Sequence, residues 1–498
     1  MKIGLQIGGF NVSLATTRTG GAYEGATTGR RARGWIAPDV GPTRAILDSA
    51  DLVRNRARQL GRNNPWAGNG LDAFVANCVG TGIRPRSKAA DGGTRERIQE
   101  LWEEWIDDAD ADQMLNFYGL QGLVARGLVE TGEVFVRFRR RRLGDGLTVP
   151  LQIQVLEADH VPLNLNRLVS DRNVIRAGIE FNAVGRRVAY HMHPTHPDDP
   201  AIALRAAFAK RVNANDVIHV FRPLRPGQIR GISWMSRVLV KLFELDQYDD
   251  AELVRKKTAA LFAGFVTKQA DDTSILGEAT ETDETEVEVG LEPGTMQVLL
   301  PGEDLKFSEP ADVGGSYEQF INTQLRAVAA GMGVTFEQLT GDMSKVNFSS
   351  IRAGLIEFRR RCTMFQQNIL NFQFNRRVWR EWLAQAVLAG ALDMAPARSL
   401  DRSVTAVKWI GQGFEWVDPL KEQQAQQSAV RNAFKSRSEV VAQMGRDIED
   451  VDDEITADNE RADRLGIVAD SDPRKVSKGG GAQGPEQLEI FDQEREAS

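Results

Sequence analysis

Three histidines stand close together near the middle of the chain. His191, His193 and His196 lie within six residues, and imidazole nitrogens are common ligands of zinc. Two prolines, Pro194 and Pro197, interrupt the group, and no cysteine or distant histidine supplies an obvious fourth ligand. The spacing therefore favours a surface turn after a strand over a metal site.

An acidic run farther upstream has a superficial likeness to a calcium-binding loop. It extends from Asp107 to Asp112. Counted from Asp108, the sixth position is Gln113 and the twelfth is Gly119, where an EF-hand loop requires glycine and glutamate. We expect this run to be the solvated end of a helix.

Groups that handle phosphate are also scarce. The chain has no Gly-x4-Gly-Lys-Ser/Thr loop, so it is not expected to be an ATP-driven motor. The arginine runs 139–142 and 359–361 could touch phosphates, but such runs on a strand end or a helix face more often stay solvated or pair with acids. The sequence predicts no catalytic residue, no metal and no cofactor. Two rival interpretations remain, a metal-dependent nuclease or terminase subunit and a capsid or scaffolding protein.

Composition limits the class of protein further. The 498 residues include 62 basic and 69 acidic side chains, and this net charge of −7 argues against a protein that coats nucleic acid. A chain of this length is expected to fold as several domains. The only cysteines, Cys78 and Cys362, have apolar neighbours in sequence, which predicts two buried thiols in a reducing compartment. No apolar run approaches the roughly 18 to 20 residues that span a bilayer, so we expect a cytosolic product without a membrane partner.

Apolar spacing predicts the elements that position these groups. Residues 1–44 show no steady period and suggest an extended arm, whereas residues 45–60 have the spacing of one helix face, with Arg54, Arg56 and Arg58 largely outside it. Short β-rich runs at 133–138 and 151–156 follow more helices, so the fold class is α+β. The predicted helix face comprises Ile46, Ala50, Val53, Ala57 and Leu60.

Two further helices bracket a small β module. Ser233 could cap a helix that runs to about Ala260, a length of about 42 Å. A shorter helix begins at Tyr317 and presents Ile321, Leu325, Val328 and Met332 on one face. Between them lie β-like runs and an acidic insert from Asp271 to Glu288.

The C-terminal half combines a loop, a long helix and a helical end. The polar stretch 340–349 predicts a loop, and a helix of about 40 residues follows, capped by Ser349 or Ser350 and ended by Gly390. That helix is either a coiled-coil seam or a spine that crosses a large domain. A β-like stretch at 404–409 precedes three helical segments that begin at Asp418, and a tail begins at 471. The predicted buried face of the long helix comprises Ile351, Leu355, Phe358, Cys362, Phe365, Ile369, Phe372, Trp379, Trp382 and Ala386.

Several motifs resemble those of the lambda-like tailed-phage portal proteins. They occur in the family's order along nearly the whole chain, and Phe348 stands where relatives often carry tyrosine. The motifs are Tyr23–Ala26, Gly34-Trp35, Leu52–Leu60, Arg62–Pro65, Val79–Pro85, Asp216–His219, Arg225–Gly231, Leu291–Gly294, Asn347–Arg352 and Trp416–Lys421.

The resemblance implies a multidomain portal architecture. Its expected parts are an N-terminal arm (1–44), a wing (45–231), a first stem helix (232–262), a clip (263–315), a second stem helix (316–334), a tunnel loop (335–350), a long wing helix with a closing strand (351–417), a helical crown (418–470) and a disordered tail (471–498). Twelve copies are expected to form a ring at one capsid vertex of the virion.

The resemblance also implies partners and site residues. The clip would dock the large terminase subunit during packaging and a head-completion or adaptor protein afterwards, while the ring contacts major capsid or scaffolding protein. Double-stranded DNA would pass through the channel without specific binding. The expected clip residues are Glu284, Glu286, Glu288, Glu292 and Gln297. The expected channel residues are Asp342, Met343, Ser344, Lys345, Val346 and Asn347.

A channel for DNA should avoid deep phosphate-binding wells, because the polyanion must slide. Twelve copies would carry a formal charge of about −84 at −7 each, and acids facing the bore would repel phosphates. Lys345 is hypothesised to face the channel and to touch the DNA backbone transiently.

Overall fold

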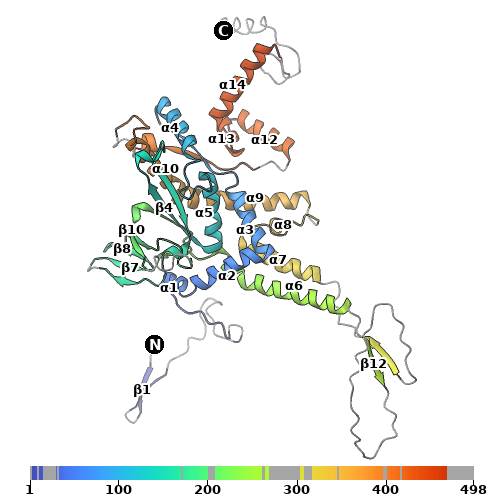
Figure 1. Ribbon diagram of the computed structural model, residues 1–498. Coiled ribbons are helices and arrows are strands. Elements are labelled where there is room, and N and C mark those ends of the chain that lie inside the picture. The colour runs from blue at the N-terminus through green and yellow to red at the C-terminus, as the bar shows by residue number, and fades with distance from the viewer. Residues whose placement is uncertain are drawn as a thin grey trace, which may run out of the picture.

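The computed structural model describes residues 3–7, 10–14, 30, 33–169, 172–199, 208–260, 264–268, 303–307, 317–344, 347–395, 401–414 and 418–467. Helices and antiparallel sheets form a central body, from which the pair α6–α7 extends on one side and α12–α14 at another end (Figure 1). The predicted mixture of helix and sheet is confirmed. Within the described part of the chain, no helix is both long and apolar enough to cross a membrane.

The N-terminal helices belong to the central body (Figure 1). Side chains of Asn64, Asp91 and Asn116 accept hydrogen bonds from the first turns of α3, α4 and α5, which fixes where each helix begins. The predicted arm contains a short hairpin, β1 (Ile3–Ile7) with β2 (Phe10–Leu14). The helices are α1 (Pro42–Leu47), α2 (Ala50–Asn63), α3 (Pro65–Cys78), α4 (Gly92–Trp105) and α5 (Phe117–Thr131).

The structure corrects the prediction for residues 45–60. The segment forms two helices that break at Asp48-Ser49, although Ile46, Ala50 and Leu60 are buried as expected. Arg54, which was expected to lie largely outside the apolar face, is 2% exposed. Two of its acidic partners, Glu133 and Asp159, come from distant segments, so local spacing alone could not reveal its burial.

Two antiparallel sheets lie beside these helices. One has the strand order β11-β4-β5, and Val136 of β4 pairs with both Ile218 and Val155. The other has the order β10-β9-β8-β7-β6. The first sheet comprises β4 (Glu133–Arg140), β5 (Leu151–Leu156) and β11 (Val217–Phe221), as the β-rich runs predicted. The second comprises β6 (Arg167–Leu168), β7 (Val174–Arg176), β8 (Ile179–Phe181), β9 (Arg187–Met192) and β10 (Lys210–Asn213).

The two bracketing helices are present and pack side by side (Figure 1). Ser233 caps a 3₁₀ turn, Trp234–Arg237, and the α-helix α6 then runs from Leu239 to Ala260. Its 22 residues span about 33 Å, shorter than predicted, because the first turn is not α-helical. α7 (Tyr317–Met332) buries all four predicted face residues. Between them, β12 (Gly264–Lys268) pairs with β13 (Glu303–Phe307).

The long C-terminal helix is present but is not uniform. α9 (Phe348–Phe365) continues into a π-helical segment, Gln366–Asn375, and then into α10 (Arg376–Leu388). The wider π turns shift the register, so Phe372 is 62% exposed while Phe374 is fully buried. The prediction that Phe372 lies on the buried face is therefore wrong. Asn347, rather than Ser349 or Ser350, caps the helix through the backbone N–H of Ser350.

Aromatic rings join this helix to the rest of the core. Trp102 of α4 lies 5.0 Å from the Trp379 ring and 5.1 Å from the Trp382 ring, measured between ring centroids. Phe117 packs against Phe374 in a stacked arrangement. The long helix thus crosses the body as a spine, which is one of the two alternatives that the sequence left open.

The last described helices are joined to the body by ion pairs of Arg86 with Glu449 and Asp450. The segment predicted as β-like at 404–409 forms a short helix, α11 (Arg402–Thr405), and β14 (Val407–Ile410), which pairs with β3 (Arg84–Ser87). Asp418 caps the next helix as predicted. No residue of the last three helices, all within the described chain, is buried. They are α12 (Pro419–Arg431), α13 (Arg437–Gln443) and α14 (Ile448–Leu465).

Candidate functional site

The polar loop after α7 is held at both ends. Gly333 and Gly341 adopt left-handed backbone angles, with φ of 85° and 71°, which glycine tolerates best. Between them a short helix, α8 (Phe336–Thr340), is fixed by a capping box in which Thr335 and Gln338 exchange hydrogen bonds. This helix occupies the first part of the segment 335–350 that was expected to be the tunnel loop, and its signal in the sequence was the Thr-x-x-Gln spacing.

The residues expected to line a channel lie between α8 and α9. The Asp342 carboxylate accepts a hydrogen bond from the Ser344 backbone N–H at 2.9 Å, and Met343 is 60% exposed. Asn347 closes the segment by capping α9. Lys345 and Val346 lie outside the described residues. The described loop therefore has fixed ends and presents an exposed methionine between them.

The helix pair α6–α7 is joined along its length. Val238 sits so close to Gly331 that a Cβ at Gly331 would lie 2.3 Å from its side chain, which explains a glycine in this helix. Farther out, the Tyr317 hydroxyl donates to the Asp249 carboxylate at 2.7 Å. Burial, together with the hydrogen bond and charge of Asp249, raises the pKa of Tyr317 to about 12. The tyrosine is therefore a neutral donor at neutral pH.

A fully buried charge cluster lies where β4, β11 and the loop before α6 meet. Arg230 is 0% exposed and donates to Glu133 at 2.6 and 2.8 Å, and His219 Nε2 lies 3.0 Å from the same carboxylate. Burial would raise the pKa of Glu133, but the charge of Arg230 and the His219 contact hold it well below its usual range. Burial lowers the pKa of His219 to about 4 despite Glu133, so this imidazole is neutral. The cluster thus combines a buried ion pair between Glu133 and Arg230 with a neutral histidine.

Arg230 also joins the two sheets through backbone carbonyls. Its guanidinium donates to the carbonyl oxygens of Ala177 at 2.7 Å and Val161 at 3.1 Å, which belong to segments around the five-stranded sheet. Arg54 of α2 approaches Glu133 at 3.7 Å from another side. Sequence reasoning did not assign these residues a role. Glu133 and His219 in otherwise apolar strands were the available signal, because buried charges need partners.

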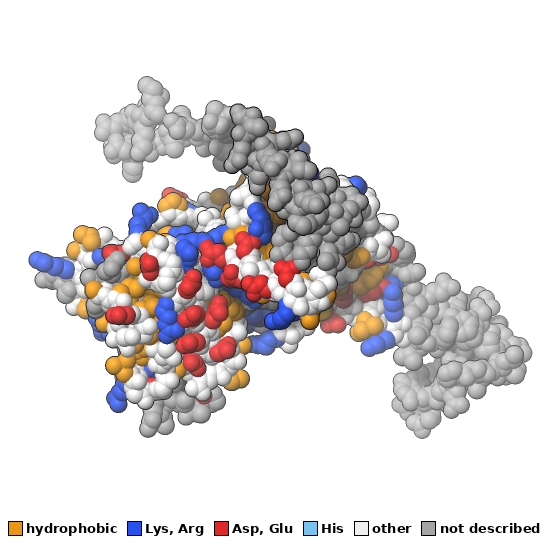
Figure 2. Space-filling model, turned by 90° about the horizontal axis from the view of Figure 1, so that it is seen from above, with side chains coloured by type: hydrophobic (Ala, Val, Ile, Leu, Met, Phe, Trp, Pro, Cys, Tyr) orange, Lys and Arg blue, Asp and Glu red, His pale blue; other side chains and the backbone are white. Residues whose placement is uncertain are grey.

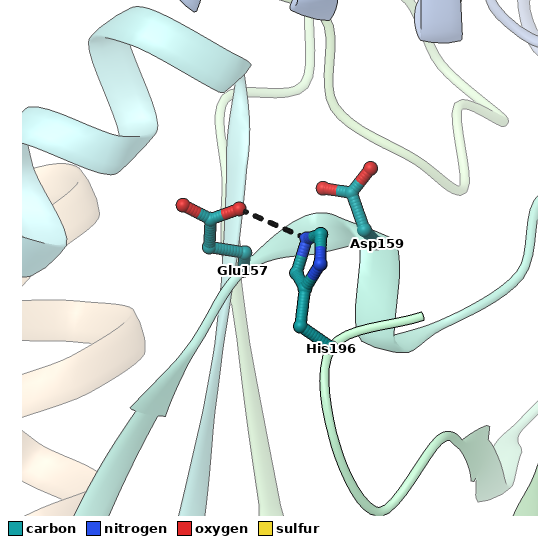
Figure 3. Close-up of side chains that lie close together, drawn as sticks. All are labelled: Glu157, Asp159 and His196. Atoms are coloured by element: carbon teal, nitrogen blue, oxygen red, sulfur yellow. Dashed lines mark ion pairs between the residues drawn. The ribbon is translucent and has the colours of Figure 1, made fainter. Parts of the chain in front are cut away.

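One of the three clustered imidazoles, that of His196, lies beside two carboxylates. Glu157, Asp159 and His196 place one ligand atom each within 4.8 Å of one another (Figure 3). Both carboxylates already bind Arg58, at 2.6 Å for Glu157 and 2.5 Å for Asp159. Burial would raise the pKa of Asp159, but hydrogen bonding to Arg58 and the charge of Arg54 lower it to about 2. The group is an ion-pair network, in which a metal would have to compete with the arginines.

The other two histidines of the cluster contact different residues. His191 lies inside β9 and is buried, with Nε2 3.3 Å from Glu180, so the expectation of a surface turn is wrong for this residue. The backbone N–H of His193 donates to the carbonyl oxygen of His160 at 2.7 Å. Among the described residues, neither belongs to a group of three or more potential metal ligands.

The acidic and basic runs have structural partners. Asp110 is buried, and its carboxylate accepts 3.0 Å hydrogen bonds from the backbone of Asp112, Met114 and Leu115, so the run is not wholly solvated as expected. Arg140 pairs with acids, as the sequence favoured, with distances of 2.6 Å to Asp216 and 2.7 Å to Glu381.

Comparison with known proteins decides the family. The family model described as phage portal protein, lambda family, matches residues 28–366. The chain belongs to this family. Portal proteins are structural subunits rather than enzymes, so membership confirms the prediction of a non-enzymatic chain.

Individual portal relatives are moderately similar. The probable portal protein of Halomonas phage phiHAP-1 is 28% identical over 436 residues, which cover 85% of this chain and 82% of the relative. Portal protein B of Escherichia phage lambda is 23% identical, with 86% and 87% covered. A solved structure titled as the neck of a native gene transfer agent particle computed with C12 symmetry matches with a TM-score of 0.44 at 16% identity, covering 78% of this chain and 93% of that one.

One portal motif can now be explained physically. Arg225–Gly231 supplies Arg230 to the buried cluster, and Gln228 holds the loop by accepting from the Leu224 backbone at 2.7 Å. A Cβ on Gly231 would lie 2.1 Å from the carbonyl oxygen of Gly132, so only glycine fits there. In this portal chain the motif thus fixes the entry into α6.

The portal clip residues expected from the sequence cannot be placed in the same way. All five fall outside the described residues, as does the second β-like run predicted at 296–300; nearby, β12 pairs with β13, which begins after that run. They are Glu284, Glu286, Glu288, Glu292 and Gln297.

Proposed function

We propose that this chain is the subunit of a ring, expected to be a dodecamer, at one vertex of the virion. The ring forms the channel through which double-stranded DNA is packaged and ejected. The match to the lambda portal family over residues 28–366 carries this proposal. The α6–α7 pair supports it, because two packed helices with a β module at their far end suit a stem and a clip (Figure 1). In these terms the sheets and α1–α5 form the wing and α12–α14 the crown.

The proposed channel lining is the loop from Asp342 to Asn347. Its capped ends would hold it in place while DNA slides past, and Lys345 would touch phosphates transiently. The acidic crown would let DNA pass without binding it tightly, since α14 carries eight acids and only two arginines. Acidic side chains gather in the middle of the face seen from above, the end at which α14 lies (Figure 2).

The proposed partners follow from the stages of assembly. The clip docks the large terminase subunit while DNA enters and a head-completion or adaptor protein afterwards, and the ring contacts major capsid or scaffolding protein. The protein is made in the host cytoplasm and ends in the virion. The acids Glu284 to Glu292 are proposed as part of the docking surface for terminase.

Imaging tests the ring directly. Purified wild-type chain should give rings with a central hole in negative-stain micrographs, whereas filaments, shells or monomers alone would contradict the proposal.

The channel loop needs a separate test. Lys345→Glu should lower the DNA packaged per particle, because a carboxylate repels the backbone that the lysine touches. Lys210→Glu, an exposed charge reversal on β10, serves as the matched control and should package normally. Full packaging by the Lys345 variant would refute its placement in the channel while leaving the ring intact.

A further inference from the structure

Helix α6 is apolar on two opposite sides. Val238, just before it, and Leu242 and Leu245 within it face the body and are buried. On the other side, the spacing of Val240, Phe243 and Ala251 again follows one helix face, yet Val240 is 66% and Phe243 48% exposed. A helix with apolar residues on both sides is normally covered on both. One of these sides is uncovered in the single chain.

Acids border the uncovered side. Glu244 and Asp250 flank the apolar residues in the helical projection, and both are exposed. Neither carboxylate forms an ion pair within the described part of the chain. We call Val240, Phe243, Glu244, Asp250 and Ala251 the outer face of α6.

A cavity of about 670 Å³ lies beside the end of α7, near the start of the α6 segment. Its walls include the buried aromatic side chains of Phe74 and Phe365. Three exposed apolar side chains also line it, with exposed fractions of 49% for Leu224, 52% for Met364 and 62% for Phe372. Phe372 reaches the cavity because of the π-helical register, and π segments are frequent at functional sites.

Three arginines give the cavity a positive charge. Arg222, Arg237 and Arg361 line it, and none of them forms an ion pair with a described residue. Arg222 stacks over the Trp234 ring at 4.9 Å. Burial and the nearby charge of Arg237 lower the pKa of Arg222, which is the sign of cations gathered without acids.

The two surfaces are complementary but cannot meet within one chain. The outer face is apolar with an acidic border, and the cavity is apolar with a basic one. Ser236 and Arg237 line the cavity just before α6 begins, whereas Phe243 and Ala251 lie about 9 and 21 Å farther along the axis at 1.5 Å per residue. A contact between two different surfaces of identical chains is heterologous, and such contacts close into rings when the rotation permits.

We propose that the outer face of α6 of one copy docks into the arginine-lined cavity of the next copy. The inference rests on the proposed function, which supplies the neighbouring copies. Phe243 is the apolar anchor, and Glu244 and Asp250 pair with arginines at the cavity rim. Charge pairs of this kind select the partner and register of an interface.

Two variants separate the two halves of the contact. The double variant Glu244→Arg with Asp250→Arg reverses the charge at the border of the outer face and leaves the cavity unchanged. The double variant Arg237→Glu with Arg361→Glu reverses two charges of the cavity and leaves the outer face unchanged. Each variant alone should lose rings and sediment with the 55.1 kDa mass of one chain. An equimolar mixture should form rings again, with the two variants alternating, because the unchanged surfaces still pair and the reversed surfaces are complementary to each other.

The mixture also controls for folding, since a misfolded variant could not complement the other. Arg186→Glu with Lys210→Glu, two exposed charges near the five-stranded sheet, is the matched control and should form rings like wild type. Rings formed by either contact variant alone would overturn the inference, as would a mixture without rings, while wild-type rings would preserve the proposed function. Wild-type chain that formed no ring would instead refute the proposed function itself.

Discussion

The buried Glu133–Arg230 pair provides the sharpest test of how the body is held together. In Arg230→Met, the guanidinium that reaches Glu133 and the carbonyl oxygens of Val161 and Ala177 is lost. Both members of the pair are at most 1% exposed, so water cannot replace the missing donor without rearrangement. Removing one partner of a buried ion pair costs about 3–5 kcal/mol. We therefore expect a loss of that size in the free energy of unfolding of the body.

Thermal unfolding followed by calorimetry is the appropriate assay. A loss of about 1 kcal/mol shifts Tm by roughly 2–4 °C for a domain of 150–250 residues, so the variant should melt about 6–20 °C lower. Arg97→Met removes an exposed pair with Glu100, with side chains 47% and 64% exposed, and should cost at most about 1 kcal/mol.

A double substitution separates pairing from packing. Glu133→Leu combined with Arg230→Met removes both charges, and it should recover part of the loss because no uncompensated buried charge remains. If Arg230→Met melted within about 2 °C of wild type, the cluster would not hold the sheets together and the reasoning would fail.

Three further predictions concern other parts of the chain. The pKa of His219 is lowered to about 4 from the usual value near 6.5, so between these pH values the unfolded chain binds a proton that the native chain does not. The free energy of unfolding should therefore fall by roughly 3 kcal/mol as pH drops through this window. His219→Gln should abolish that fall in thermal melts measured over a series of pH values. Cys78 and Cys362 are free and fully buried with Sγ atoms 2.8 Å apart, and burial raises the pKa of Cys78. A thiol reagent should therefore label neither cysteine in the native chain and both after denaturation, and rapid labelling of the native chain would contradict this. Arg86 binds Glu449 and Asp450 at 2.8 Å each, so Arg86→Ala should raise amide hydrogen exchange in α14 but not in β4; unchanged exchange in α14 would show that these pairs do not attach it.

An element could be predicted from the sequence where local apolar spacing alone decides its structure. α7 was predicted correctly, because its four apolar face residues meet one continuous surface. Phe372 was misplaced because π turns change the residue period, which an assumed α-helical spacing cannot show. Asn347 was passed over as the cap in favour of two serines that follow it by two and three residues, an error typical of helix boundaries.

The candidate site was less accessible to sequence reasoning for a different reason. Arg54 looked like a solvated residue, yet two of its carboxylate partners lie 79 and 105 positions away, at Glu133 and Asp159. Only the packing of α2 against the sheets brings them together. The family motifs located Arg230 in the chain but did not reveal that it is buried, since burial is set by three-dimensional neighbours.

Charged side chains are arranged differently in the body, whose core is complete in one chain, and along α6, which we propose packs against a neighbouring copy. In the body, Glu133 and Arg230 satisfy one another in full burial, which is the arrangement that a self-sufficient core requires. Along α6 the charges are arranged differently, because Glu244 and Asp250 border apolar side chains without a described cation, while the cavity arginines lack acids. A single chain that left both surfaces open would expose apolar area and unbalanced charge for no local gain. The simplest physical account is that α6 reaches its final packing only when another copy covers it, so assembly completes the fold of this helix.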